Sequence, residues 1–209
     1  MRLFDYAASA NCYKVRLLLS LLDRPYERVP VDIFAGETLT DAFALRNPVR
    51  ETPVLELDDG EVITQSGAIL WYLASGTPYL PEDRLDRARV VQWLAFEQER
   101  VMGGIGAPRF RRATARPELP GRLEIGASAL AVLDAHLRTR AWLVGDGPTI
   151  ADVAVYGYAH VADDAGLDLA GQQALGALQE RIRALPGFVA DLSPYPPNAR
   201  TGAGRSIYD

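Results

Sequence analysis

The stretch NPVRETPVLEL at residues 47–57 decides the fold, because it opens an apolar strand with a proline. Proline supplies no backbone N–H to a strand ladder, so Pro53 is an unusual first residue for a strand. A cis peptide bond between Thr52 and Pro53 would turn the backbone of Thr52 outward, as an edge on which a ligand can dock. The alternative is an ordinary proline at the edge of a sheet.

Strand and helix patterns alternate on both sides of this stretch. Apolar residues recur at helical spacing over 10–23, and the turn Asp58-Asp59-Gly60 between two apolar runs is typical of a hairpin. The predicted elements are, in chain order, a strand at 3–6, a helix at 10–23, a strand at 26–31, a helix at 40–45, strands at 53–57 and 61–64, and a helix at 65–73. This order predicts an α/β domain over residues 1–76, with a small mixed sheet covered by helices.

The strand signals stop at a linker over 77–86, which contains Pro78 and Pro81. Beyond it, apolar residues at helical spacing predict helices at 84–103, 119–139, 150–161 and 173–185. Thr149 and Asp152 have the spacing of a capping box at the start of the third of these helices. We therefore expect residues 87–209 to form an all-α bundle, with an irregular tail from Ser193 that is rich in proline, glycine and asparagine.

The composition is that of a globular protein. Apolar residues make up 48% and charged residues 23% of the 209 residues, and the formal net charge is −5. This balance argues against a nucleic-acid partner and against anionic membranes. The one cysteine, Cys12, cannot form an internal disulfide, which favours a cytoplasmic location. No window approaches the roughly 18 apolar residues that span a bilayer. His136 and His160 lack a metal-ligand pattern, so we expect no metal.

The first candidate site is Ser9-Ala10-Asn11-Cys12, between the first predicted strand and helix. It has the spacing of a Cys-x-x-Cys redox site, with serine in the leading position. A helix N-terminus presents unpaired N–H groups and the positive end of a dipole. The Ser9 hydroxyl can therefore donate a hydrogen bond to a bound thiolate and lower the pKa of that thiol below about 8.5. The alternative is that Ser9 only caps the helix.

The second candidate site is Gln65-Ser66, at the start of the last helix of the α/β domain. A side-chain amide, a hydroxyl and free backbone N–H groups converge at this point. That combination suits a bound carboxylate, which accepts several hydrogen bonds at once. The alternative is that Ser66 is simply the N-cap of this helix.

Four stretches together carry a resemblance to a known family: SANCYKVRLLL, NPVRETPVLEL, ITQSGAILWYLA and VGDGPTIADVAVYGY. Along essentially its whole length the chain resembles the cytosolic glutathione S-transferase superfamily, as a bacterial member with a serine-type active site. The resemblance implies a thioredoxin-like domain followed by a helical domain. It also implies that Ser9 activates the thiol of glutathione, that Thr52 with Pro53 binds the cysteinyl backbone, and that Gln65 with Ser66 holds the γ-glutamyl carboxylate.

The chain departs from the common pattern of this family at the glycyl end of glutathione. The segment GETLTDAF carries no basic residue for the glycyl carboxylate, so Arg50 is the nearest candidate. Glu51 stands where relatives often have a basic residue or glutamine. We therefore expect a less positive binding pocket than in many relatives.

Asn11 and Cys12 each leave two interpretations open. Asn11 either donates a second hydrogen bond to the thiolate or caps the helix backbone. Cys12 lies one turn inside the helix, where a free cysteine usually acts as a small apolar residue. The rival interpretation of Cys12 is a redox role through a mixed disulfide with glutathione.

The resemblance favours a glutathione transferase (an activity of the EC 2.5.1.18 type) that activates the glutathione thiol for attack on a small hydrophobic electrophile, as in detoxification. One alternative is a glutathione-dependent disulfide reductase or peroxidase, and another is a binding module without catalysis. Glutathione would be a co-substrate, with no metal. The resemblance also implies a homodimer in which Glu97 or Gln98 would reach the partner's glutathione.

The electrophile would lie against an apolar wall where the two domains meet. Candidate residues for this wall are Tyr6, Phe34, Met102, Ile105, Phe110 and Tyr158. The tail, which carries Tyr195, Arg205 and Tyr208, is expected to fold over the pocket.

Overall fold

The N-terminal part of the chain forms a four-stranded mixed sheet. The computed structural model describes residues 1–208, and its strands are β1 (Arg2–Asp5), β2 (Glu27–Pro30), β3 (Val54–Glu56) and β4 (Val62–Thr64), in the spatial order β2-β1-β3-β4. β1 runs parallel to β2 and antiparallel to β3, and β3 pairs antiparallel with β4 across the predicted hairpin. The predicted mixed sheet is confirmed, with strand bounds that differ from the predicted ones by at most one residue.

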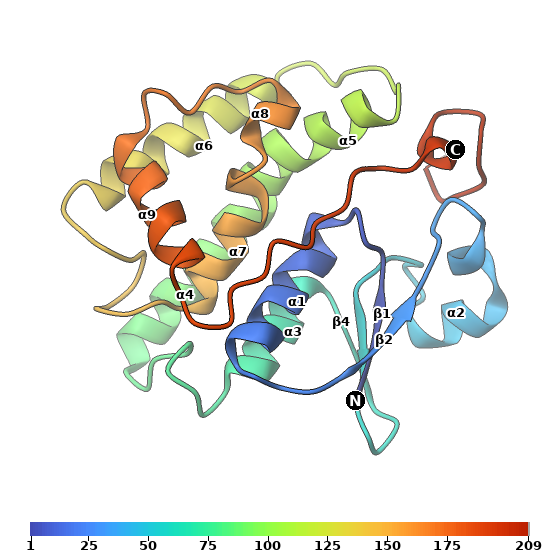
Figure 1. Cartoon of the computed structure of the whole chain (residues 1–209), viewed down its shortest axis with the longest axis horizontal. Coiled ribbons are helices and arrows are strands. Elements are labelled where there is room, and N and C mark those ends of the chain that lie inside the picture. Colours follow the sequence, from blue (N-terminus) through green and yellow to red (C-terminus); the bar gives the residue numbers. More distant parts are fainter. Residues whose placement is uncertain (209) are drawn as a thin grey trace.

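The alternation of side chains along the strands decides which helices cover which face. Leu3 of β1 and Leu55 of β3 join the main apolar core with α1 (Ala10–Leu21) and α3 (Ser66–Ala74). Phe4 and Val54 are one residue along, so they point to the opposite face, where they pack with Phe43 of α2 (Asp41–Arg46). Figure 1 shows α1 and α3 between the sheet and the helical half of the chain. A 3-10 turn without a sequence signal, η1 (Glu37–Leu39), leads into α2.

Helices form the C-terminal half, as predicted. They are α4 (Arg84–Phe96), the π-helical segment η2 (Glu97–Gly106), α5 (Ala107–Ala113), α6 (Arg122–Leu137), α7 (Ile150–Ala159), α8 (Ala162–Ala165) and α9 (Gln173–Arg183). α7 packs against α1 and so joins the two halves, whereas α6 lies farther from the sheet (Figure 1). Within residues 1–208, no helix is both long and apolar enough to cross a bilayer.

The helical segment that starts at Arg84 extends beyond the predicted range of 84–103. It runs from α4 through η2 into α5 and ends at Ala113. Glycine weakens an isolated helix, but the glycines of η2 instead let α6 approach closely. A Cβ on Gly104 would lie 2.3 Å from the backbone nitrogen of Gly126, so a larger residue there would push α6 away. The predicted end near Gly103 was wrong because helix packing, and not a turn, uses these glycines.

The predicted capping box starts α7. Asp152 Oδ2 accepts hydrogen bonds from the backbone nitrogen of Thr149, at 2.8 Å, and from its hydroxyl, at 2.9 Å. Asp152 Oδ1 accepts a further bond from the backbone nitrogen of Leu143, at 2.9 Å. Burial raises the pKa of Asp152 to about 6 in spite of these donors. The motif therefore positions α7 and the loop before it, as the sequence indicated.

The tail after α9 returns to the N-terminal domain (Figure 1). The backbone nitrogen of Ser193 bonds to the carbonyl of Ala7, at 3.1 Å, and that of Arg205 to the carbonyl of Phe34, at 2.8 Å. Between them, a 3-10 turn η3 (Pro197–Ala199) places the Asn198 side chain 2.8 Å from Asp32 Oδ2. The tail thus bridges the two halves of the chain.

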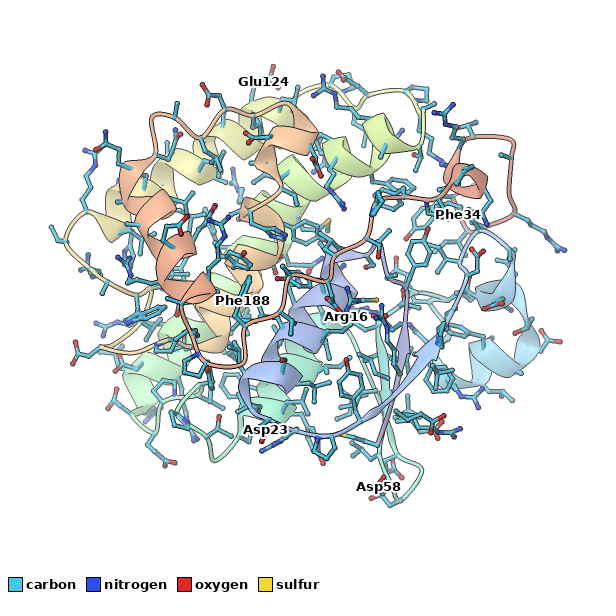
Figure 2. All side chains as sticks on the ribbon, in the orientation of Figure 1. Arg16, Asp23, Phe34, Asp58, Glu124 and Phe188 are labelled. Atoms are coloured by element: carbon cyan, nitrogen blue, oxygen red, sulfur yellow. The ribbon has the colours of Figure 1, made fainter. Side chains whose placement is uncertain are left out.

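A buried arginine fixes the start of this tail. Arg16 of α1 binds Asp5 of β1 through Nη1, at 2.5 Å, and both oxygens of Asp191 through Nε, at 3.0 and 2.9 Å. Its Nη2 lies 3.3 Å from the carbonyl oxygens of Ala7 and Asp191. Arg28 binds the second oxygen of Asp5 at 2.6 Å. Figure 2 shows Arg16 where the tail crosses α1. One guanidinium therefore holds a strand, a helix and the tail together.

We expect the substitution Arg16→Met to lower the free energy of unfolding by about 3–5 kcal/mol, because it leaves the buried carboxylate of Asp5 without its main partner. Urea unfolding monitored by circular dichroism measures this change. The matched control is Arg89→Met, which removes an exposed arginine paired with Asp86 and should cost about 0.5 kcal/mol or less. Equal effects of the two substitutions would contradict the role given to Arg16.

Candidate active site

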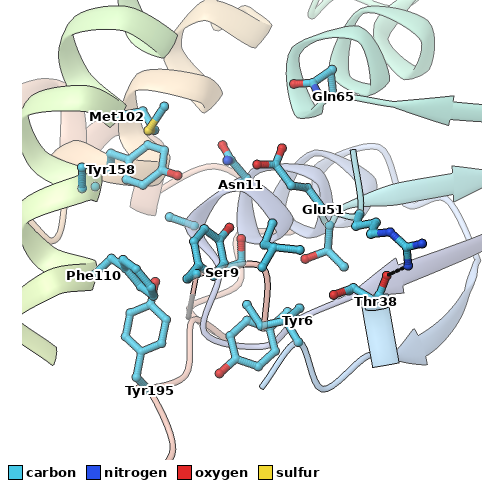
Figure 3. A pocket seen from close by; sticks show the side chains of 18 of the residues that line it. Tyr6, Ser9, Asn11, Thr38, Glu51, Gln65, Met102, Phe110, Tyr158 and Tyr195 are labelled. Atoms are coloured by element: carbon cyan, nitrogen blue, oxygen red, sulfur yellow. Dashed lines mark hydrogen bonds between the residues drawn. The ribbon is translucent and has the colours of Figure 1, made fainter. Parts of the chain in front are cut away.

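A cavity of about 320 Å³ lies where the two halves of the chain meet. The N-terminal domain contributes mostly polar residues, among them Ser9, Asn11, Thr38, Arg50, Glu51, Thr52 and Gln65. The helical half and the tail contribute mainly apolar and aromatic residues, among them Met102, Phe110, Tyr158, Tyr195, Ile207 and Tyr208. Figure 3 shows these two sets facing each other. A cavity of this size with a few convergent polar groups suits a small ligand.

Ser9 occupies the turn between β1 and α1. Its extended backbone makes it the N-cap of α1, and its Oγ accepts a hydrogen bond from the backbone nitrogen of Cys12, at 3.3 Å. The capping interpretation is thus confirmed. A cap bond uses a lone pair of the oxygen, so the hydroxyl proton can still be donated. Capping and donation to a ligand are therefore compatible in this one side chain.

Cys12 lies below this turn and is fully buried. Its Sγ accepts a hydrogen bond from the backbone nitrogen of Tyr6, at 3.4 Å. Burial raises the pKa of the Cys12 thiol to about 11, which outweighs the lowering by hydrogen bonds from Thr52, Tyr6 and Ser9. Cys12 does not line the cavity. The thiol is therefore protonated at neutral pH, which disfavours the redox interpretation of this residue.

Asn11 and Ser66 connect the starts of α1 and α3. The Ser66 hydroxyl donates to Asn11 Oδ1 at 3.2 Å, so the Asn11 amide keeps its N–H donors for another partner. The alternative of Ser66 as an N-cap was wrong, because Gln65 is the N-cap and Ser66 is the first helical residue. Gln65 has a φ of 69°, in the left-handed region, and lines the cavity.

The Thr52-Pro53 bond is cis, as the proline at the start of β3 indicated. Thr52 lines the cavity together with Ser9 and Gln65, which lie at the starts of α1 and α3. The structure thus brings Ser9, Asn11, Thr52 and Gln65 to one polar wall, although 56 positions separate Ser9 from Gln65 in the sequence.

Arg50 also reaches the cavity, but its guanidinium already has partners. Nη1 donates to the carbonyl oxygens of Thr38, at 3.1 Å, and Thr40, at 3.0 Å, and Nη2 lies 3.8 Å from Asp41. Arg50 is the one basic residue among the described residues that line the cavity. Glu51 beside it is half-buried, and loss of hydration raises the pKa of its carboxyl group. The polar wall therefore carries little positive charge.

The aromatic wall differs in part from the prediction. Tyr6, Met102, Phe110 and Tyr158 line the cavity as expected, and so do Tyr195 and Tyr208 of the tail. Phe34 and Ile105 do not: both are buried behind the wall, and Phe34 stacks on Phe110 with ring centroids 6.2 Å apart. Arg205 also stays outside the cavity, because its backbone pairs with Phe34.

Glu97 cannot serve the role that the resemblance implied. It is buried, and its Oε1 lies 3.0 Å from Nζ of Lys14 in the same chain. Burial raises the pKa of Glu97, and the charge of Lys14 offsets this in part. The prediction that Glu97 reaches a partner's ligand was therefore wrong, whereas Gln98 is exposed and lines the cavity of its own chain.

Comparison with known proteins decides the family. The family model described as glutathione S-transferase, N-terminal domain, matches residues 3–79, and the model described as glutathione S-transferase, C-terminal domain, matches residues 114–197. The chain belongs to the glutathione S-transferase superfamily. The two matches fall on the thioredoxin-like sheet domain and on the helical half of the structure.

Two relatives and one solved structure are similar to this glutathione S-transferase-like chain along most of its length. It is 33% identical over 202 residues to a maleylacetoacetate isomerase of Rhizobium meliloti, covering 89% of this chain and 92% of that protein. It is 29% identical to the disulfide-bond oxidoreductase YfcG of Escherichia coli, covering 87% and 89%. The crystal structure of a possible glutathione S-transferase from Rhodopseudomonas palustris aligns with a TM-score of 0.85 and 42% identity, covering 92% and 97%.

Some residues of the transferase-like cavity carried no sequence signal. Ile33 lies in a loop, Thr38 in the short 3-10 turn η1 and Ile207 in the tail, where no periodicity indicates which way a side chain points. Their positions follow from long-range contacts, such as the backbone bond between Arg205 and Phe34. A pattern search along one sequence does not detect such contacts.

We expect Cys12 to resist alkylation in the folded protein, because its thiol is buried and protonated. Iodoacetamide at pH 8 should label it only after denaturation, as read by mass spectrometry. The control is Ser75→Cys, which places a second thiol at an exposed position and should be labelled at once in the folded protein. Labelling of Cys12 at the rate of that exposed thiol would restore its redox role.

Proposed function

We propose that this chain binds glutathione in the cavity between its two halves and activates the glutathione thiol for attack on a small hydrophobic electrophile. The observation that carries this proposal is the chemical division of the cavity into a polar wall and an aromatic wall. A peptide with charged ends needs the polar wall, and an apolar co-substrate needs the aromatic wall. Membership of the glutathione S-transferase superfamily supports the choice of peptide.

The sulfur of glutathione is assigned to Ser9. Its hydroxyl lies at the start of α1, where the unpaired N–H groups and the positive end of the helix dipole favour an anion. Asn11, whose Oδ1 is already occupied by Ser66, offers its amide N–H groups as a second donor. Hydrogen bonds to the charged form lower the pKa of a thiol and so increase the fraction of reactive thiolate at neutral pH.

The remaining parts of glutathione are assigned along the same wall. The backbone of Thr52, before the cis Pro53, is assigned to the cysteinyl part. Gln65 and Ser66, at the start of α3, are assigned to the γ-glutamyl carboxylate. The glycyl carboxylate faces Arg50, whose guanidinium is shared with two backbone carbonyls. This end is therefore held more weakly than the γ-glutamyl end.

A second candidate is a glutathione-dependent disulfide reductase or peroxidase. The likeness to the disulfide-bond oxidoreductase YfcG favours it. The same bound thiolate would attack a sulfur of the disulfide, and burial of Cys12 means that Cys12 would take no part. A third candidate, a binding module without catalysis, is supported by the weak glycyl end. Retention on immobilised glutathione together with turnover of 1-chloro-2,4-dinitrobenzene or of a small disulfide separates the three.

The thiol assignment predicts that Ser9→Ala lowers kcat/KM for 1-chloro-2,4-dinitrobenzene at pH 7 by about 10- to 100-fold, because a hydrogen bond to a charged group contributes about 1.5–3 kcal/mol. The apparent pKa of the bound thiol, from the pH dependence of the rate, should rise toward the roughly 8.5 of a free thiol. Ser9→Thr keeps the hydroxyl and should retain most of the activity. An unchanged rate and pH profile in Ser9→Ala would remove Ser9 from the mechanism.

We also propose a cytoplasmic homodimer. Exposed apolar side chains at Tyr72 of α3 and at Leu85 and Val91 of α4 support it, since each is about half exposed in the isolated chain. Sedimentation velocity should give about twice the chain mass of 22.8 kDa. The substitution Val91→Glu should shift the protein toward the monomer, whereas Val132→Glu on α6, a valine of similar exposure, should not. A monomer at all micromolar concentrations would refute the proposal.

A further inference from the structure

The polar wall of the cavity contains a carboxylate that has no partner. Glu51 directly precedes Thr52, is half-buried and lines the cavity. Within residues 1–208, no hydrogen bond or ion pair engages its side-chain oxygens, and loss of hydration raises the pKa of its carboxyl group. Figure 3 shows this side chain pointing into the cavity. A carboxylate that has lost water without gaining a partner is stabilised when a ligand supplies a donor or a cation.

The neighbouring cation does not neutralise Glu51. Nη1 of Arg50 donates to the carbonyl oxygens of Thr38, at 3.1 Å, and Thr40, at 3.0 Å, and Nη2 lies 3.8 Å from the carboxylate of Asp41. The guanidinium is thus held at the segment that leads into α2. Arg50 is also the one basic residue among the described residues that line the cavity. This end of the polar wall therefore keeps an unpaired negative charge.

The charge of Glu51 acts across the cavity as well. Burial is the largest cause that raises the pKa of the Tyr208 hydroxyl, and the charge of Glu51 is the next. Tyr208 lines the cavity from the tail. The field of Glu51 therefore extends into the space that a ligand would fill, where a low-dielectric wall strengthens it.

The strand register indicates which end of a bound peptide meets Glu51. β3 pairs antiparallel with β4, and their register continued beyond the ladder places Gln65 beside Pro53. Thr52 and then Glu51 follow in order away from that point. An extended peptide whose γ-glutamyl end lies at Gln65 and whose cysteinyl part lies at Thr52 therefore brings its glycyl end to Glu51.

We propose that Glu51 makes the cavity selective for glutathione derivatives whose glycyl carboxylate is converted to an amide, above all an amide that carries an ammonium group. The amide N–H and the ammonium group would donate to the Glu51 carboxylate, whereas a free glycyl carboxylate meets a like charge. This inference rests on the proposed function, because it keeps the thiol at Ser9 and the γ-glutamyl end at Gln65. It extends that function by naming the class of thiol substrate and the residue that selects it.

Glutathione itself carries a rival partner for Glu51, the ammonium group of its γ-glutamyl end. The register argument places that end at Gln65, two residues away from Glu51 along the wall. The two assignments differ in what they expect of a change at the glycyl end. Amidation improves binding only when Glu51 faces the glycyl group, and it has no effect when Glu51 faces the γ-glutamyl ammonium group.

The test compares three thiols with 1-chloro-2,4-dinitrobenzene at a fixed concentration: glutathione, its glycinamide analogue and its N-(3-aminopropyl)glycinamide analogue. At low ionic strength we expect kcat/KM for the thiol to rise about threefold from glutathione to the amide and about 10-fold to the aminopropyl amide, because a half-buried charge pair is screened only in part. Isothermal titration calorimetry with the S-methyl derivatives should give the same order of affinity without turnover.

The variant Glu51→Gln keeps the size of the side chain and removes its charge. The differences among the three thiols should fall below about twofold in this variant. Amidation also changes the intrinsic reactivity of the thiol, and the ratio between wild type and variant cancels that effect. Glu61→Gln is the matched control, since Glu61 is an exposed glutamate of the β3–β4 hairpin outside the cavity, and it should keep the order of the wild type.

Salt gives an independent readout on the wild type alone. Raising NaCl from about 20 mM to about 500 mM should shrink the preference for the aminopropyl amide, since screening weakens an attraction between charges. If Glu51→Gln does not fold, the order of the three thiols in the wild type and its salt dependence decide the question.

The outcomes separate this inference from the proposed function. The expected order in the wild type, lost in Glu51→Gln and kept in Glu61→Gln, supports the inference. Three equally good thiols, a preference for glutathione itself, or an order that persists in Glu51→Gln would overturn the inference alone. A similar loss for all three thiols in Glu51→Gln would assign Glu51 to the γ-glutamyl ammonium group and also overturn it. A wild type that binds none of the three thiols would overturn the proposed function as well.

Discussion

The buried guanidinium of Arg16 is the interaction on which the rest of this structure depends. It binds the carboxylates of Asp5 and Asp191 and the carbonyl oxygen of Ala7. Asp5 ends β1 and Ala7 lies two residues before Ser9, so the same group that anchors the tail also fixes the turn that presents the Ser9 hydroxyl. The buried carboxylate of Asp5 is tolerated in the interior because Arg16 and Arg28 bind its two oxygens, whereas the side chain of Asp191 is partly exposed. The turn that carries Ser9 is therefore held by an arginine whose three side-chain nitrogens all have hydrogen-bond partners.

A second arginine extends this arrangement to the aromatic wall. Arg109 of α5 lies 3.3 Å from the carbonyl oxygen of Ala8, binds Asp164 at 3.0 Å and stands over the ring of Tyr195, at 5.1 Å from its centroid. It thus connects the Ser9 turn, the helical half and the tail. Arg109 thereby joins the polar wall to the aromatic wall, although they come from segments far apart in the sequence. In the proposed reaction these contacts keep the wall that binds the thiolate and the wall that binds the electrophile in place relative to each other.

The sequence alone predicted those features that depend on local rules. The cis Thr52-Pro53 bond, the Thr149–Asp152 capping box and the mixed sheet follow from proline chemistry, residue spacing and alternation, which act within a few residues. The errors concern contacts that span the chain. Glu97 pairs with Lys14, 83 positions away, and no pattern within the helix indicates that its side chain turns inward. Phe34 and Ile105 were placed on the wall because they are apolar, yet core and cavity positions have the same composition. Gln65 lines the cavity, whereas Ser66 does not, and the alternative that Ser66 caps α3 assigned the cap to the wrong residue of the pair.

A crystal structure of the protein with bound glutathione tests the central claim most directly. The account predicts the glutathione sulfur within hydrogen-bond distance of Ser9 Oγ, with the γ-glutamyl carboxylate at the start of α3 beside Ser66. It also predicts that the side of the sulfur that does not face Ser9 points across the cavity to the wall that carries Tyr158. Glutathione bound outside this cavity, or bound with its sulfur away from Ser9, would contradict the account.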